Sequence, residues 1–262
     1  MATSTSEQTL RRTAHEIFQH VENNAHEELR RSPHALAFSG LAGGLSMGLT
    51  GLGVASAMAA LPDFPAREFL AYTIYPIGFT AVIIGRAQLF TENTLYPVAL
   101  ILSERRHFMD TLRLWLVVFS FNVLGAAAFA ALAVLTEALP AEIRAELVRL
   151  GIRAAQGGFG HIFWSGVIGG WIIALVAWLV TASHWTIGQV AVIWLLTFTV
   201  GIGHFAHCIA SSGEIMSAVF SGSVPFARYL QWLGTATAGN IFGGVLIVTL
   251  LNFGQVKVGE TE

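Results

Sequence analysis

Four long stretches of this 262-residue sequence contain no Asp, Glu, Lys or Arg, and they limit what the chain can fold into. They span residues 36–62, 114–136, 154–213 and 229–256. Each reaches or exceeds the roughly 20 residues that an α-helix needs to cross a bilayer. Charged residues make up 11% of the chain, whereas soluble globular domains contain about 25%. The sequence therefore predicts an all-α polytopic membrane protein.

Two polar segments interrupt these apolar regions and form the candidate functional site. Polar groups at membrane depth are costly unless protein or water satisfies them, so they mark functional sites more often than defects. We expect each segment to break a transmembrane helix. The polar candidates in residues 86–93 and 203–214 are Arg86, Glu92, Asn93, His204, His207, Ser211 and Glu214.

The apolar segments predict six transmembrane spans, with the second and the fifth broken. Their expected ranges are 36–61, 69–103, 114–136, 161–182, 187–220 and 229–253. Together they form a channel domain of residues 36–253, preceded by a polar N-terminal segment (1–35) and followed by a polar tail (254–262). Between the third and fourth spans, a surface helix is expected over residues 137–153.

The N-terminal segment predicts an amphipathic helix over about residues 7–31, because its apolar residues recur mostly three and four positions apart. Such a helix suits a cap that packs on its own or a neighbouring subunit. A helix on the membrane surface, or a regulatory one, is the alternative. The apolar stripe consists of Leu10, Ala14, Ile17, Phe18, Val21, Ala25 and Leu29.

Basic residues are unevenly distributed between the two sides of the expected membrane domain. The side that holds both termini carries the larger excess, including Arg30, Arg31, Arg105 and Arg106. By the positive-inside rule, both termini then lie in the cytoplasm, and the membrane is a plasma membrane such as the bacterial inner membrane. The N-terminus lacks a basic-then-apolar leader, so we expect no cleaved signal peptide. The single cysteine, Cys208, excludes an internal disulfide framework.

The expected spans contain an internal repeat. SGLAGG at residues 39–44 is echoed by SGVIGG at 165–170, and NVLGA at 122–126 by NIFGG at 240–244. Asn122 and Asn240 are 118 residues apart, and the same separation carries Thr91 into the second polar segment. Repeats of about residues 36–136 and 161–253 contain three spans each, so the two halves must be inverted in the membrane. Inverted repeats with paired broken helices place a substrate path at the midplane.

The sequence from about residue 35 to residue 253 resembles the formate/nitrite transporter family. QLFTEN at residues 88–93 is similar to the family's acidic-Leu-Phe-Thr-small-Asn break, and AHCIAS at 206–211 to its Glu-His-Ser-Ile-Ala-Asn break. The resemblance implies an aquaporin-like homopentamer in which each protomer has a pore for small monovalent anions. Gln88, Ala206 and Ser211 depart from the family pattern.

The resemblance also implies roles for particular residues. His207 and Thr91 would lie at the pore centre, between two apolar constrictions. Leu89 and Phe90 would help to form the cytoplasmic constriction, and Tyr75 and Phe79 are candidates for the other one. Many family members attract anions with a lysine before the fourth span, and here Arg153 or His161 would have to substitute in the outer vestibule.

Further polar residues have expected roles that follow from the cost of burying them. An unpaired charge at the bilayer centre costs at least about 2.5–3.5 kcal/mol, so Arg86 is expected to pair with Glu92 or Glu214, to cap loop carbonyls, or to contact the anion directly. Asn122 and Asn240 are expected to tie the loop backbone to the helical frame. For His204, the sequence favours neither a packing role nor a role in the pore over the other.

The expected function is passage of small monovalent anions or their conjugate acids, such as formate, nitrite or acetate-like monocarboxylates, with proton relay at His207. We expect no cofactor, no metal, no nucleic-acid partner and no enzyme activity; the expected partners are the anion, membrane lipid and further copies of the chain. A metal site of His204, His207 and Glu214 is a weaker hypothesis, because such sites usually need three or more convergent ligands. Two more functions are compatible with such a chain, namely that of a non-conducting or regulatory membrane protein and that of a neutral-solute pore.

Overall fold

The computed structural model describes residues 12–259, and every regular element in this range is helical. The elements are α1 (Ala14–Arg30), α2 (Pro33–Ala60), α3 (Arg67–Tyr72), α4 (Ile77–Ile84), η1 (Glu92–Thr94), α5 (Tyr96–Glu104), α6 (Phe108–Leu135), α7 (Ala141–Ala154), α8 (Phe159–Ala182), α9 (Thr186–Ile202), α10 (Ala210–Phe220), α11 (Phe226–Phe242), η2 (Gly243–Thr249) and α12 (Leu250–Gly259).

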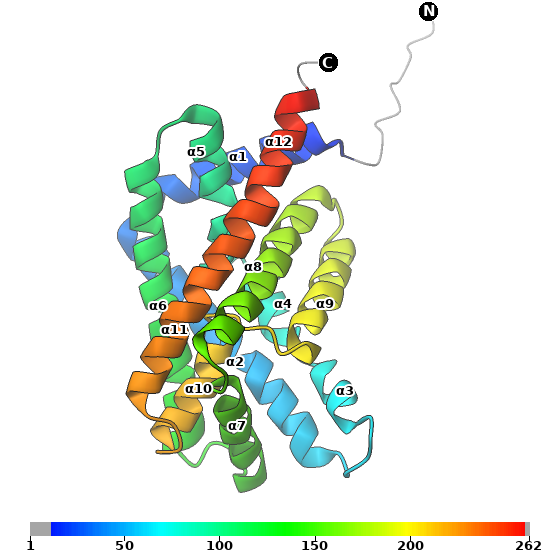
Figure 1. Ribbon diagram of the computed structural model, residues 1–262, viewed down its shortest axis with the longest axis vertical. Helices are drawn as coiled ribbons and strands as arrows, with labels where there is room; N and C mark the ends of the chain where they lie inside the picture. The colour runs from blue at the N-terminus through cyan, green and yellow to red at the C-terminus, as the bar shows by residue number, and fades with distance from the viewer. Residues whose placement is uncertain (1–11, 260–262) are drawn as a thin grey trace, which may run out of the picture.

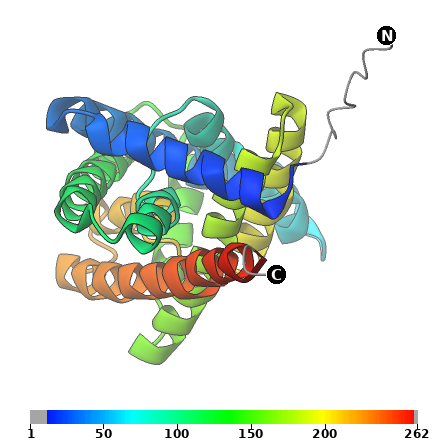
Figure 2. The same ribbon diagram turned by 90° about the horizontal axis from the view of Figure 1, so that it is seen from above.

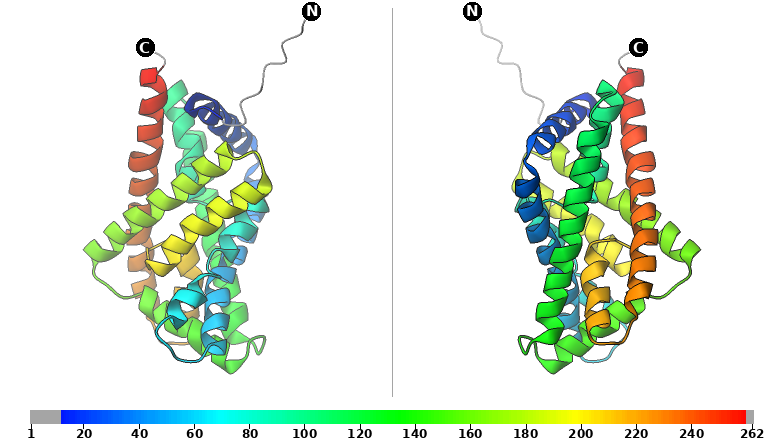
Figure 3. Two further views of the ribbon diagram at one scale, coloured as in Figure 1. Left: turned by 90° about the vertical axis from the view of Figure 1, so that its right-hand side faces the viewer. Right: turned by 90° about the vertical axis from the view of Figure 1, so that its left-hand side faces the viewer.

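Four of these helices are long and apolar enough to cross a membrane, namely α2, α6, α8 and the continuous helix Phe226–Val258. Figure 3 shows α6 and the α11–α12 helix running the height of the molecule. The second and fifth expected spans are indeed interrupted: α4 is separated from α5, and α9 from α10. The four long helices overlap the ranges expected for the first, third, fourth and sixth spans.

Several boundaries differ from those expected. The second span contains an additional turn between α3 and α4, where Pro76 lacks the N–H that a continuous helix needs. The second break ends earlier than residue 214, because α10 already begins at Ala210. The expected polar tail is partly helical, since α12 continues to Gly259. The π-helical turn η2 was not expected, and its Thr249 hydroxyl donates to the carbonyl of Thr94 in the first break at 3.1 Å.

The two halves pack in the same way. α2 lies along α6 in the first half, and α8 lies along α11 and η2 in the second. Close approach requires glycine at equivalent positions: a Cβ on Gly44 would lie 2.0 Å from the carbonyl oxygen of Asn122, and one on Gly170 would lie 2.2 Å from that of Asn240. The repeated small-residue motifs therefore bring each asparagine helix against its neighbour, as is common between transmembrane helices.

Helix α1 lies across one end of the molecule, transverse to the long helices, as Figures 1 and 2 show. It begins at Ala14 behind a capping box of Thr13 and Glu16. The expected start near residue 7 and the stripe residue Leu10 lie outside the described residues. Its buried face, including Phe18 and Val21, packs on apolar residues of α5, α8 and the C-terminal helix. The stripe therefore packs within the same chain. The C-terminal end of α12 lies at the same end of the molecule (Figure 1).

Candidate functional site

Each break begins at a helix end that turns through a non-glycine residue in the left-handed conformation. Arg86 follows α4 with φ 58°, and His204 follows α9 with φ 51°. The N–H of the next residue bonds back to the carbonyl five positions earlier, at 3.0 Å after Arg86 and 3.1 Å after His204, as in a Schellman motif. A left-handed non-glycine residue costs roughly 1–2 kcal/mol. Tertiary packing therefore has to hold both turns in place.

Asn122 of α6 fixes the first break from the side. Its amide oxygen accepts the N–H of Phe90 at 2.9 Å. Its Nδ2 donates to the carbonyls of Gly40 and Gln88, at 2.7 Å and 2.9 Å respectively. The Asn122 side chain is fully buried, and it joins the break to both α2 and α6.

Asn240 of α11 does the same for the second break. Its amide oxygen accepts the N–H of Cys208 at 2.8 Å, and its Nδ2 donates to the carbonyls of Gly166 and Ala206 at 2.8 Å and 2.9 Å. This side chain is also fully buried. The two asparagines therefore make equivalent hydrogen bonds in the two halves, and the repeat seen in the sequence is also a repeat of contacts.

Two serines complete the anchoring of the breaks. The N–H of Gln88 donates to Ser39 Oγ at 3.1 Å, and the N–H of Ala206 donates to Ser165 Oγ at 2.9 Å. The sequence did not single out either serine, although each begins a repeated small-residue motif. At Gln88 and Ala206, where the sequence departs from the family pattern, the backbone carries the anchoring bonds, so these bonds do not require an acidic side chain.

The two breaks meet at Thr91 and His207. Thr91 Oγ1 lies 2.8 Å from His207 Nε2, and both residues are fully buried. The second ring nitrogen, Nδ1, accepts the N–H of Ala210 at 3.0 Å. An acceptor nitrogen carries no proton, so this contact assigns the neutral ring proton to Nε2, which donates it to Thr91. The Thr91 hydroxyl hydrogen then has no acceptor among the described residues.

A series of aromatic rings extends from this contact. Phe79 packs edge-on against His207 with ring centroids 5.1 Å apart, and Tyr75 lies 5.8 Å from Phe79. Tyr72 follows at 6.0 Å from Tyr75 and 5.1 Å from His204. The series therefore links the central histidine to the start of the second break, and it contains both candidates for the outer constriction.

A cavity of about 720 Å³ opens beside the outer end of this series. It is lined by Tyr72, Tyr75, Arg153, His161, His204, Ser211 and Glu214, among further residues. Both vestibule candidates, Arg153 and His161, line this cavity, which we call the outer cavity. Ser211 and Glu214 reach the cavity from helix α10 rather than from the break itself.

The charge of this outer cavity differs from the positive vestibule that was expected. The guanidinium of Arg153 is bonded to the carboxylate of Glu68, which also lies 3.2 Å from His204 Nε2. Glu214 makes no hydrogen bond or ion pair with any residue of the described part of the chain, and it is 9% exposed. Because Glu68 offsets Arg153, the cavity has no excess of positive charge while Glu214 is ionised. Glu68 is a site residue that sequence spacing does not reveal.

A smaller cavity of about 210 Å³, which we call the inner cavity, lies on the α1 side of the breaks. Arg86, Gln88, Leu89, Glu92 and Asn93 line it, and α1 contributes Asn24, Glu27 and Glu28. Asn93 is positioned by donating to Gln88 Oε1 at 2.8 Å and by accepting, at its carbonyl, the indole N–H of Trp115 at 2.8 Å. Thr91, His207 and Phe79 line neither cavity, whereas Tyr75, which packs on Phe79, lines the outer one and Leu89 lines the inner one.

Arg86 forms neither of the two ion pairs expected for it. It lines the inner cavity, whereas Glu214 lines the outer one, so the two side chains are on opposite sides of the central contact. With Glu92 it shares the inner cavity, but no ion pair joins them in the part of the chain that the structure describes. Arg86 is solvent-exposed, and water therefore stabilises the charge in place of a carboxylate.

Phe90 and Leu89, the two candidates for the cytoplasmic constriction, have different surroundings. Its ring packs against Phe119 and Trp115 of α6, with centroids 5.0 Å and 5.7 Å away. Phe90 does not line the inner cavity, but Leu89 does. Consecutive residues in the break point in different directions, which explains why only one of the two lines the inner cavity.

The metal site considered for the second break does not assemble there. His204 bonds to Glu68, while His207 is engaged by Thr91 and Ala210. The two imidazoles therefore have separate partners and do not converge with Glu214.

Comparisons with known proteins identify the family. A family model described as formate/nitrite transporter matches residues 15–254. The chain is 32% identical over 248 residues to the inner membrane protein YfdC of Escherichia coli (strain K12), an alignment that covers 92% of this chain and 78% of YfdC. The chain belongs to the formate/nitrite transporter family. It is a membrane transport protein and not an enzyme, as predicted.

Solved structures of two channels share the fold of this chain. An FNT family ion channel superposes with a TM-score of 0.82 at 19% identity, covering 91% of this chain and 98% of that chain. A pentameric formate channel with formate bound superposes with a TM-score of 0.70 at 16% identity, covering 90% and 99%. The expected all-α membrane architecture is therefore confirmed.

Proposed function

We propose that this chain conducts small monovalent anions or their conjugate acids, such as formate or nitrite, across a bacterial inner membrane. The observation that carries the proposal is the buried contact of Thr91 and His207, where two equivalent helix breaks meet between an inner and an outer cavity. The family is named for formate and nitrite transport, one similar solved structure is a pentameric formate channel, and the relative YfdC is an inner membrane protein. We infer a homopentamer with one path in each protomer, with α1 and both termini on the cytoplasmic side.

The barrier between the cavities favours passage as the neutral acid. A bare ion in a low-dielectric constriction pays a large desolvation cost, and Phe79 and Leu89 offer it no polar compensation. A carboxylate that takes up a proton no longer pays this cost. Protonation close to the central contact is therefore the step that makes transfer feasible, and flux should rise as the pH is lowered.

The tautomer of His207 defines its part in this step. Its Nε2–H holds the oxygen of Thr91, which leaves the Thr91 hydroxyl hydrogen free to donate to an arriving anion. A relay through the ring requires a second proton on Nδ1, and that nitrogen must first release the N–H of Ala210. We infer that His207 orients the anion through Thr91 in its neutral form and relays a proton only when this backbone contact opens.

Glu214 is the group that we propose as the proton donor on the outer side. Its carboxyl lines the outer cavity, and Ser211, one helical turn closer to His207 along the chain, lines the same cavity. When its carboxyl is protonated, Glu214 no longer repels an anion that enters the outer cavity, and it carries a proton that can be transferred. Arg153 and His204 are both engaged with Glu68, so they do not neutralise Glu214.

Uptake by proteoliposomes tests the proposal. Formate, nitrite and acetate are supplied at several pH values to vesicles containing the wild-type protein, His207→Ala or Glu214→Gln, with glycerol as the neutral solute. We expect wild-type uptake of at least one anion, faster at acidic pH, and a loss of most of that uptake in His207→Ala. Glu214→Gln should retain uptake but lose most of its acceleration by acid. No anion uptake by folded protein would support a non-conducting role, and glycerol uptake alone would support a neutral-solute pore.

A further inference from the structure

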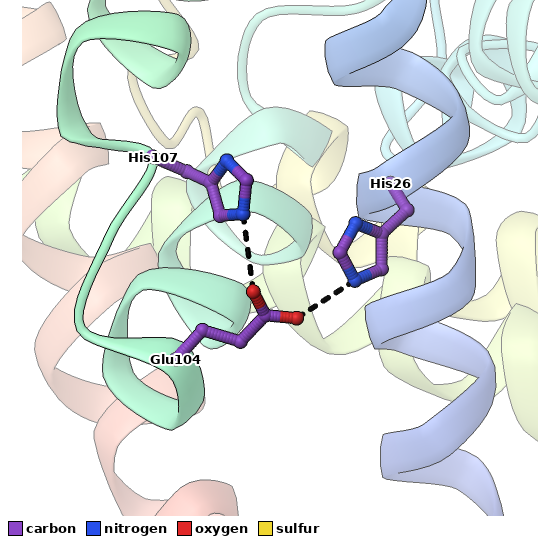
Figure 4. A group of neighbouring side chains, drawn as sticks. All are labelled: His26, Glu104 and His107. Atoms are coloured by element: carbon purple, nitrogen blue, oxygen red, sulfur yellow. Dashed lines mark hydrogen bonds and ion pairs between the residues drawn. The ribbon is translucent and has the colours of Figure 1, made fainter.

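A cluster of two histidines and one carboxylate joins α1 to the segment between α5 and α6, away from the conduction path. His26 lies on α1, Glu104 ends α5, and His107 precedes α6. Figure 4 shows two imidazole rings facing the Glu104 carboxylate, one from α1 and one from the segment between α5 and α6. His26 Nε2 lies 2.9 Å from Glu104 Oε1, and His107 Nε2 lies 3.1 Å from Oε2. The three ligand atoms lie within 4.8 Å of one another.

The ring of His107 lies between two carboxylates. Its Nε2 faces Glu104, and its Nδ1 lies 3.5 Å from Asp110 Oδ2. A neutral imidazole carries only one N–H, so one ring nitrogen directs a lone pair at a carboxylate. An ion bound at Nε2 removes this conflict, as a second ring proton would, and leaves Nδ1–H facing Asp110. A carboxylate that orients a metal-bound histidine in this way is a recurrent feature of metal sites.

We propose that His26, Glu104 and His107 bind a divalent transition-metal ion of the zinc class. Two imidazoles and one carboxylate with a water in the fourth position form a ligand set that suits tetrahedral Zn²⁺. The ion would clip α1 to the turn between α5 and α6.

The surroundings of the cluster admit an ion. The three side chains are between 22% and 32% exposed, so an ion can enter from solvent. A cavity of about 220 Å³, lined by His26, His107 and Asp110 among others, leaves room for a water ligand.

Arg106 competes with the ion for Glu104. Its Nε donates to Glu104 Oε2, yet the Arg106 side chain is 68% exposed and can turn into water. Removing this guanidinium should therefore tighten metal binding, whereas a purely structural ion-pair network has no reason to bind metal more tightly after losing a member.

Metal binding by α1 bears on the inner cavity. Asn24, Glu27 and Glu28 line that cavity from the same helix that carries His26. An ion that fixes His26 to Glu104 thereby also fixes these three residues over the cavity. This inference concerns a site separate from the conduction path, so it stands or falls independently of the proposed transport.

Cobalt and zinc titrations test the site without any transport measurement. Full-length protein in detergent, purified through a histidine-free tag and stripped with EDTA, is titrated with Co²⁺ and then with Zn²⁺. We expect saturable binding of one Co²⁺ per chain with the visible absorption of a four-coordinate site, and displacement by Zn²⁺. His26→Ala and His107→Ala should weaken binding at least about tenfold, and Asp110→Asn by about 10–100-fold. His20→Ala, on the same helix but outside the cluster, is the matched control and should bind normally.

Arg106→Ala should change the metal affinity in the opposite direction: this variant should bind Co²⁺ more tightly than the wild type does. The absence of saturable binding to the folded wild-type protein would overturn the proposal. Binding that is unaffected by His26→Ala and His107→Ala, or reduced equally by His20→Ala, would also overturn it, because the ion would then lie elsewhere.

Discussion

Replacement of the two frame asparagines should destabilise the protein equally, although they lie 118 residues apart in sequence. Asn122→Ala removes an acceptor for the N–H of one break and donors for two carbonyls, and Asn240→Ala removes the equivalent three bonds in the second half. Both side chains are fully buried, so no bulk water replaces the lost partners.

The expected magnitude follows from these bonds. Each buried hydrogen bond contributes about 1 kcal/mol net, so losing three lowers the free energy of unfolding by about 3 kcal/mol in either variant. The double variant should lose about twice as much, because the two sites share no hydrogen-bond partner and distant sites add. Flux should fall in both single variants, since each asparagine holds a break that contributes Thr91 or His207.

Reversible unfolding in detergent measures these effects, with Asn23→Ala on the exposed side of α1 as the control. Similar losses for Asn122→Ala and Asn240→Ala, against an unchanged control, are the expected result. A loss confined to one of the two variants would refute the equivalence of the halves. A loss well below 1 kcal/mol in both would refute the anchoring role itself.

Three further predictions concern the backbone and the N-terminal helix. Gly44→Ala and Gly170→Ala each place a Cβ within 2.2 Å of the facing asparagine carbonyl, so each should lower stability by about 1–3 kcal/mol in thermal unfolding; unchanged midpoints would contradict the close helix contacts. Arg86→Gly should raise stability by about 1 kcal/mol because it relieves a left-handed φ, and an unchanged midpoint would argue against strain at this turn. The hydrogen bond from the Thr13 N–H lowers the pKa of Glu16 below its ordinary 4.5, so its capping contribution is present above pH 4.5 and is lost as the pH falls through the lowered value. Amide exchange at the start of α1 should accelerate there in the wild type but not in Glu16→Gln.

The contact of Thr91 and His207 was predictable because two separate features of the sequence, the internal repeat and the family resemblance, point to it. The repeated asparagine and small-residue motifs align Thr91 with the second break, and the family resemblance selects His207 within it. The structure brings them to hydrogen-bond distance, 2.8 Å. Uncharged runs likewise predict the long helices to within a few residues, because the bilayer demands continuous apolar length.

Contacts between remote polar side chains were not predictable. Glu68 bonds to Arg153 across 85 residues and His26 to Glu104 across 78, and no local pattern links such partners. The early resumption of helix at Ala210 was missed because Ser211 and Glu214 look like loop residues, although buried helix positions that face a cavity tolerate them. Sequence also does not show that Phe90 turns toward α6 while its neighbour Leu89 turns toward the cavity.

The measurement that tests the account most directly is a double-mutant cycle on formate flux into proteoliposomes, using Thr91→Val, His207→Asn and the double variant at one acidic pH. If the Thr91 hydroxyl acts on the anion because His207 Nε2–H orients it, either single change disables the same step. Flux through the double variant should then be close to that of the slower single variant. Losses that multiply would contradict this coupling, and single variants that conduct formate like the wild type would contradict the placement of the path through this contact.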